Sequence, residues 1–297
     1  MRFRGVVAGL LGGLLITSGL LSSPVHAADP TAESITLSPV SKRYDIDAGS
    51  SLTDSFKIIN NGAIAYTFIV YARPYAIINS DYLNPNYGDA AGNITNADAY
   101  KWVQFAQGSY YLQPGQSVDV PYTVRVPAGA TPGGHYGVLF AETQSPADNG
   151  GAIGRNKRVG EVLYATVNGT FTKGAEVRAA STPFVQLAPP LSSNTSIKNI
   201  GNSDFLATVS LKVSDIFGNQ KYFEQKDYPV LPESTRAITM QWTNSPQFGL
   251  FQAEVRAKAL DKDIYTKSYV LMAPFWFYGV VAVMAVGGVI YALARRR

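Results

Sequence analysis

Apolar and polar residues alternate with a period of two along most of the middle of the chain. Clear examples are Leu52–Ile58, Val118–Val126 and Ala207–Val213. Such alternation is typical of β-strands with one buried face, because successive side chains point to opposite sides of a sheet. Between residues 30 and 270 no apolar pattern keeps a helical period for long. The middle of the chain is therefore predicted to be all-β.

Turn-forming residues separate the alternating runs. Clusters rich in Asn, Gly or Pro stand at 60–62, 113–115, 131–134, 199–202 and 217–219. Short strands at this spacing predict antiparallel sandwiches. The same order of strands and turns occurs twice along the chain. We therefore expect two tandem immunoglobulin-like β-sandwich domains, at about 33–172 and 175–272.

Two loops stand out within the first predicted domain. Residues 79–99 are rich in Asn, Asp, Gly and Ala, so an insertion is expected there rather than a strand. Farther on, His135–Gln144 is expected to pair with Arg158–Phe171 as a hairpin. The glycine-rich segment between them, Ser145–Asn156, is expected to be an exposed loop.

The N-terminus has the pattern of a secretory signal peptide at 1–27. Arg2 and Arg4 precede the apolar run Gly5–Leu21, and small residues lead to a cleavage site after Ala27. The alternative is an uncleaved N-terminal anchor, since the apolar run reaches about the lower length limit for a membrane span.

The C-terminus predicts a transmembrane helix at 274–294. No charge occurs from Ser268 to Ala294, and a helix of this length spans about 30 Å. Aromatic residues crowd its start at 275–278, and arginines follow at 295–297, which the positive-inside rule places in the cytoplasm. We therefore expect a single-pass cell-membrane protein with an extracellular N-terminal ectodomain and a cytoplasmic tail at 295–297. A buried core helix is the alternative.

The composition of the chain limits the kinds of reactive site and partner that it can have. The chain has no cysteine, which excludes disulfides and thiolate chemistry. Without the five arginines at its two ends it carries 20 basic and 21 acidic residues, so no nucleic-acid partner is expected. Cleavage would leave His135 as the only histidine, too few for a catalytic triad or a histidine metal site. We expect no cofactor, no metal and no enzymatic activity.

The segments Leu112–Gly115, Val124–Pro127 and Thr131–Phe140, the last with the order Pro-Gly-Gly-His-Tyr-Gly, resemble the first domain of bacterial WxL-interacting proteins. The resemblance implies an immunoglobulin-like first domain that binds peptidoglycan and a second domain that binds a partner protein. It also implies a signal peptide and a C-terminal membrane anchor. The second half of the chain shows no motif that matches the family.

Aromatic residues give the candidate binding site. Tyr82, Tyr87, Tyr100 and Trp102 lie in or beside the polar insertion, where exposed rings would stack on sugars or anchor a protein. The alternative is that these rings pin the insertion to the sandwich.

These patterns predict a non-catalytic, membrane-anchored surface protein that binds cell-wall glycan or a surface protein. One alternative is a spacer or scaffold without glycan affinity. A carboxylate-dependent glycan hydrolase ranks last, because the pairs Asp45/Asp47 and Asp261/Asp263 are expected to lie on solvated edges rather than across a cleft.

Overall fold

The protein is described by a computed structural model that covers residues 34–89, 96–144 and 156–295. The predicted signal peptide, residues 145–155 of the predicted loop and the last two arginines lie outside the described residues. Strands dominate the described chain, and one long apolar helix follows them at the C-terminal end. The prediction of a mostly-β protein with one C-terminal apolar helix is confirmed.

The first unit, residues 35–167, is built from two facing sheets. One has the strand order β1 (Ile35–Ser38), β3 (Ser51–Asn60), β7 (Ser117–Arg125), β5 (Val103–Phe105). The other has the order β2 (Ser41–Ile46), β9 (Arg158–Val167), β8 (Gly133–Thr143), β4 (Tyr66–Pro74), β6 (Ser109–Leu112). Among the described strands of this unit, only β2 and β9 pair in parallel. β8 and β9 form the predicted hairpin, with His135 opposite Ala165.

Side-chain alternation places the core of the first unit between its sheets. On β4, Tyr66, Phe68 and Val70 are buried, as their spacing predicts, and they meet Phe56 and Ile58 of β3 in one apolar cluster. Burial of large apolar side chains between two sheets is the main stabilising contribution to such a fold.

The second unit, residues 175–272, has the same two-layer plan with a separate core. Its smaller sheet has the order β10 (Ala175–Ser181), β12 (Leu191–Asn199), β15 (Thr235–Trp242). Its larger sheet has the order β11 (Val185–Gln186), β17 (Lys262–Met272), β16 (Gly249–Ala259), β13 (Phe205–Asp215), β14 (Gln220–Val230). Val209 and Leu211 of β13 are fully buried in this second core, which includes no residue of the first.

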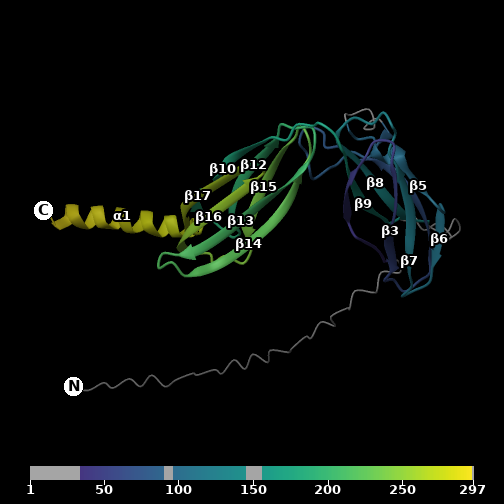
Figure 1. The fold of residues 1–297 in the computed structure, drawn as a ribbon. Helices are drawn as coiled ribbons and strands as arrows, with labels where there is room; N and C mark the ends of the chain where they lie inside the picture. The colour runs from purple at the N-terminus through teal and green to yellow at the C-terminus, as the bar shows by residue number, and fades with distance from the viewer. Residues whose placement is uncertain (1–33, 90–95, 145–155, 296–297) are drawn as a thin grey trace, which may run out of the picture.

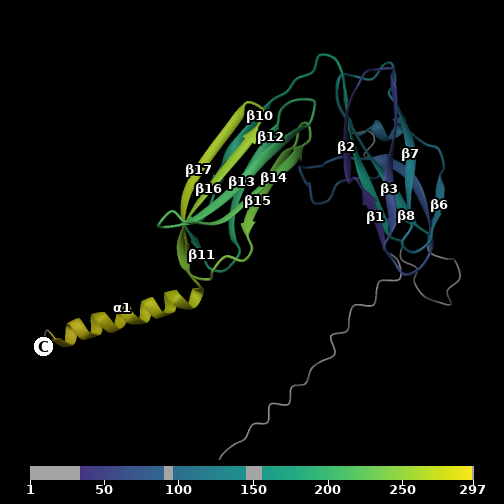
Figure 2. The same ribbon diagram turned by 60° about the horizontal axis from the view of Figure 1, so that its bottom comes forward.

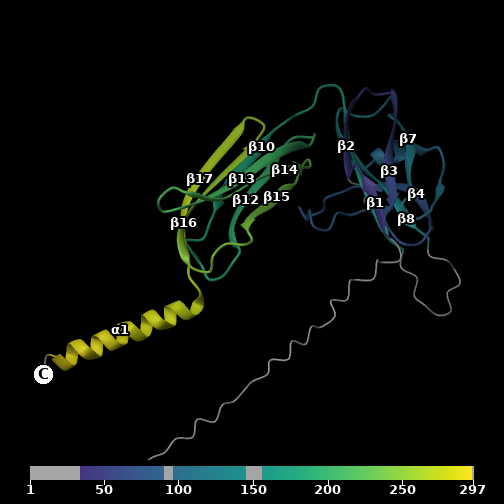
Figure 3. The same cartoon turned by 90° about the horizontal axis from the view of Figure 1, so that it is seen from below.

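Helix α1 (Phe275–Arg295) begins after the short link Ala273-Pro274. It is the one helix in the described chain that is long and apolar enough to cross a membrane, and none of it is buried. In Figure 1, Figure 2 and Figure 3 the second unit lies between the first unit and α1.

The segment between β4 and β5 departs from the sandwich. The described part of residues 79–99 contains no strand, a single bridge joins Ala76 to Asn86, and the short helix η2 (Ala99–Trp102) returns the chain to β5. Contacts from residues 80 and 82 reach the second unit, so this segment helps to join the two units.

Candidate functional site

A buried carboxylate joins the two units. Asp204 lies just before β13, and it is ion-paired with Arg43 of β2. Its Oδ1 accepts a hydrogen bond from the Tyr136 hydroxyl at 3.1 Å, and its backbone amide donates to the same hydroxyl at 2.9 Å. The guanidinium of Arg43 also lies over the ring of Tyr164 at 4.1 Å. A buried charge needs such partners, so the contacts support one another.

The Pro-Gly-Gly segment that carries the family resemblance lies at this junction. The amide of Gly134 donates to the carbonyl of Asn202 at 3.0 Å, and Asn202 Nδ2 donates to the carbonyl of Pro132 at 3.3 Å. A Cβ on Gly133 would lie 2.7 Å from the Asn202 carbonyl oxygen. Glycine is therefore required here because the second unit approaches the backbone closely.

The insertion makes a second set of contacts across the junction. Tyr82 accepts a hydrogen bond from the amide of Leu231 at 2.8 Å and shares another with the hydroxyl of Ser234. Ser80 Oγ accepts from the amide of Thr235 at 2.9 Å. The turn between β14 and β15 is thereby held against the first unit.

Arg236 of β15 completes this contact. Its guanidinium lies 4.4 Å from the ring of Tyr82 and 5.2 Å from the ring of Tyr228. It also donates to the carbonyl of Pro229 at 2.6 Å. Burial raises the pKa of Tyr82 above its usual value, so the phenol stays protonated at physiological pH. Tyr82 therefore acts as a neutral hydrogen-bonding group beneath a cation.

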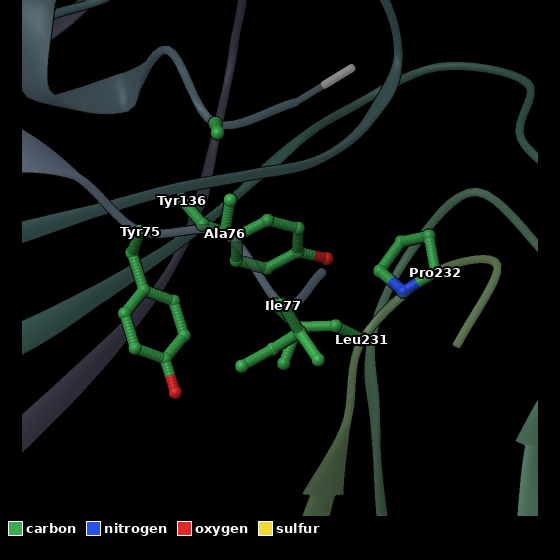
Figure 4. A pocket seen from close by; sticks show the side chains of 7 residues that line it. Tyr75, Ala76, Ile77, Tyr136, Leu231 and Pro232 are labelled. Carbon is green, nitrogen blue, oxygen red and sulfur yellow. The ribbon is translucent and has the colours of Figure 1, made fainter. Parts of the chain in front are cut away.

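A small cavity of about 40 Å³ remains inside the junction. Figure 4 shows Pro232 of the second unit facing Tyr136 and Ile77 of the first unit across it. The cavity is too small for an organic ligand, since ligand sites are typically of about 300 Å³ or more.

A larger groove opens where the insertion meets β15. It has a volume of about 510 Å³. Its lining comes from the insertion, β14 and β15: Ser80, Asp81, Tyr82, Leu83, Tyr228, Arg236, Ala237, Ile238 and Thr239. Leu83 is 91% exposed at the rim, while Arg236 and Tyr82 are half-buried. The groove thus combines apolar, aromatic and cationic surface.

The wall of the groove formed by β15 is an open strand edge. Among the described strands, β15 is the last of its sheet and pairs only with β12. The carbonyl of Ser234 accepts from Asn199, the residue that ends β12, whereas the amide of Thr235 points away from β12 to Ser80. Backbone groups in an antiparallel strand alternate in direction, so Ala237 and Thr239 also direct their amides and carbonyls outward.

Both ends of this edge are already occupied. At one end Ser80 Oγ accepts a hydrogen bond from the amide of Thr235. At the other end the Tyr222 hydroxyl donates to the carbonyl of Gln241 at 3.1 Å. Among the described residues, none bonds to the outward backbone groups of Ala237 or Thr239. The exposed edge is therefore limited to a short stretch inside the groove.

The four sequence-predicted residues do not share one surface. Tyr82 lies at the groove and the junction. Tyr87 packs edge-on against Phe140 at 5.2 Å, and Tyr100 is half-buried with Lys101 Nζ 5.6 Å from its ring. Trp102 is only 5% exposed and packs against His135 at 4.7 Å. Only Tyr82 contributes to the groove.

His135 stabilises the end of the insertion, where the chain returns to the sandwich. Nδ1 lies 2.7 Å from Asp98 Oδ1, and Nε2 lies 2.8 Å from the carbonyl oxygen of Thr131. Burial lowers the pKa of His135, but these hydrogen bonds outweigh burial and raise it above its usual value. In the described ranges no group of three His, Cys, Asp or Glu side chains could hold a metal ion.

Sequence reasoning missed Arg43, Asp204 and Arg236. Arg43 and Asp204 are separated by 161 positions, and no local pattern links them. A turn is expected at Leu231–Ser234 from its Pro and Glu, and that turn is present, but its contact with Tyr82 has no sequence signal.

No family model matches the sequence, and no curated protein matches it. Among solved structures, the chain is similar to the YadV chaperone, at 8% identity over 80% of this chain and 99% of that chain, with a TM-score of 0.40. It is similar to the CsuC–CsuE chaperone–tip adhesion subunit pre-assembly complex of Acinetobacter baumannii, at 13% identity over 79% and 97%, with a TM-score of 0.39. It is also similar to the E. coli chaperone DraB, at 12% identity over 79% and 98%, with a TM-score of 0.38. Likenesses of this size neither define a family for the chain nor indicate what it binds.

Proposed function

We propose that this chain is a non-catalytic, membrane-anchored surface protein that binds an extended segment of a partner protein along the open edge of β15. The observation that carries the proposal is the outward direction of the Ala237 and Thr239 backbone groups inside a groove of about 510 Å³. An added strand would satisfy those groups, and the groove would hold its side chains.

The architecture in this proposal is that of two immunoglobulin-like domains on a single membrane anchor, as in WxL-interacting proteins. Two separate cores and the apolar helix α1 support it. Arg295 at the end of α1 supports an orientation with the C-terminus in the cytoplasm and both domains outside the cell. The junction contacts of Asp204 and Tyr82 would hold the two domains as one body.

The groove favours a protein over a glycan as the ligand. Its open backbone edge is complementary to another backbone, and Arg236 offers a cation to an acidic or carbonyl-rich segment. The hydroxyl of Tyr82 already bonds to Leu231 and Ser234, and the guanidinium of Arg236 lies over its ring. Little of the ring face is therefore left to stack on a sugar.

The test uses a proline variant. In Thr239→Pro the outward amide is lost while the bonds to β12 remain, because proline is tolerated on the free side of an edge strand. Thr239→Val is the matched control, since both variants lose the hydroxyl bond to Asn194 and only valine keeps the amide. Full-length protein in lipid nanodiscs is incubated with solubilised surface proteins of its source cell and, separately, with purified cell wall.

We expect one defined surface protein to be captured by the wild type and by Thr239→Val, with at least a tenfold loss for Thr239→Pro. Equal capture by both variants would contradict binding at this edge. Retention on cell wall alone would instead favour the glycan hypothesis, and Tyr87→Ala and Tyr100→Ala would then identify the rings involved. Absence of any ligand would favour a spacer, a role with which the fixed junction is also compatible.

A further inference from the structure

The end of the second unit from which α1 leaves has an apolar surface. Seven large apolar side chains are exposed there: Phe184, Val185, Leu187, Ile216, Phe217, Phe248 and Leu250. Phe217 is 83% exposed, at the tip of the turn between β13 and β14. We call these seven residues the apolar end.

Strand register places the apolar end at the level where α1 begins. Val185 and Leu250 both lie opposite Leu271, two positions before the link to α1. Asp215 pairs with Phe251, so the turn at 216–219 extends about two residues farther toward α1. In Figure 1 the tip of the β13–β14 hairpin lies beside the start of α1. The ring of Phe248 contacts Phe277 of α1 at 5.0 Å between centroids.

Charged residues are nearly absent from this end. None occurs in residues 179–197, 237–253 or 268–294, which include the loops that form it. The two exceptions, Asp215 and Lys221 beside the β13–β14 turn, form an ion pair at 3.2 Å. The opposite end of the unit carries Asp204 and Arg236, so the two ends of the unit differ in charge.

We propose that the apolar end inserts into the headgroup layer of the membrane that α1 crosses, so that the second unit is seated on the bilayer rather than held above it. Continuity with the anchor identifies the bilayer as the occupant, because Ala273 and Pro274 are the whole link. Aromatic and aliphatic side chains without nearby charge partition favourably into this layer. The inference rests on the anchoring part of the proposed function.

The test exploits the absence of cysteine from the chain. Single cysteines carrying an environment-sensitive fluorophore are introduced in the full chain, reconstituted in vesicles of phosphatidylcholine and phosphatidylglycerol with a headgroup spin-labelled lipid. Gln220→Cys and Gln247→Cys report on the apolar end. Gln225→Cys is the matched control, an exposed glutamine about 16 Å farther along β14. Val283→Cys in α1, read with acyl-chain quenchers, reports on the anchor itself.

We expect quenching at 220 and 247 to exceed that at 225 by at least threefold. Equal quenching at all three positions, with Val283→Cys quenched by acyl-chain labels, would overturn the seating of the second unit while leaving the anchor intact. Failure of Val283→Cys to be quenched would overturn the anchoring, and this inference with it.

A second variant tests the residues themselves. Phe217→Ser is expected to reduce quenching of the label at 247 at least twofold. Phe223→Ser removes another exposed ring, on β14 and away from the turn, and is expected to leave this quenching unchanged. An unchanged thermal midpoint in both variants shows that the fold is retained. Equal quenching in both variants would contradict insertion by the β13–β14 turn.

Discussion

Tyr136 and Asp204 are joined by two hydrogen bonds that cross from the first unit to the second. The tyrosine hydroxyl donates to the carboxylate at 3.1 Å and accepts from the backbone amide at 2.9 Å. Burial raises the pKa of Tyr136 well above its usual range, so this hydroxyl remains a donor at all physiological pH values. The pair fixes the direction in which the second unit leaves the first.

Tyr136→Phe should loosen the junction. The variant removes both bonds and leaves the amide of Asp204 without its partner, at a cost of about 1–3 kcal/mol. Distances between spin labels placed in the two units should become broader in pulsed electron resonance. Tyr222→Phe is the control, because its hydroxyl bonds within the second unit. Unchanged distance distributions in Tyr136→Phe would contradict the role assigned to this pair.

Gly134→Ala should disrupt the same pair from the backbone. A Cβ at this position would lie 1.9 Å from the Tyr136 hydroxyl oxygen, so the ring must move and lose its bonds. We expect a loss of about 1–3 kcal/mol in the free energy of unfolding, measured by urea denaturation. Gly129→Ala, where nothing lies within 4 Å, should be close to neutral. Similar stabilities of the two variants would show that the close approach is unimportant.

Glu161 makes the first unit sensitive to pH. Its side chain is fully buried, Tyr122 donates to Oε1 at 2.8 Å, and Oε2 has no partner among the described residues. Burial raises its pKa to about 7. Between the unfolded pKa of about 4.5 and this value the folded state binds more protons, so stability falls as pH rises, by roughly 3 kcal/mol at most.

Glu161→Gln should remove the part of the fall in stability with rising pH that Glu161 causes. Denaturation between pH 4 and pH 8 should show a smaller decline in the variant than in the wild type, whereas the exposed Glu176→Gln should keep the wild-type slope. His135 adds a decline of the same sign above about pH 6.5, because its pKa is also raised, so the difference between proteins isolates Glu161. Equal slopes for Glu161→Gln and the wild type would contradict a protonated buried carboxyl.

Local patterns predicted the strands and the C-terminal apolar helix well. Period-two alternation identified the buried side chains of β4, and the charge-free run at 274–294 matches α1 to within one residue at each end. Both patterns are local in sequence. The buried face of a strand and the apolar character of a membrane-length helix are determined by residues within one short segment.

The candidate site was harder to predict, because it depends on contacts across the chain. The polar surroundings of Tyr82 make it a candidate binding residue, but its partners lie about 150 positions away in the turn between β14 and β15. Nothing in the sequence around Tyr82 indicates that contact. The open edge of β15 also has no sequence signature. Edge strands are defined by the order of strands in the sheet, and alternation alone does not give that order.

Amide hydrogen exchange in the complex tests most directly whether a partner adds a strand to β15. The captured partner is bound to the full-length protein in nanodiscs, and exchange is followed at Ala237 and Thr239. We predict that both amides become at least tenfold more protected on binding, because each donates to the partner backbone. Unchanged exchange at both amides in a fully formed complex would contradict the proposal.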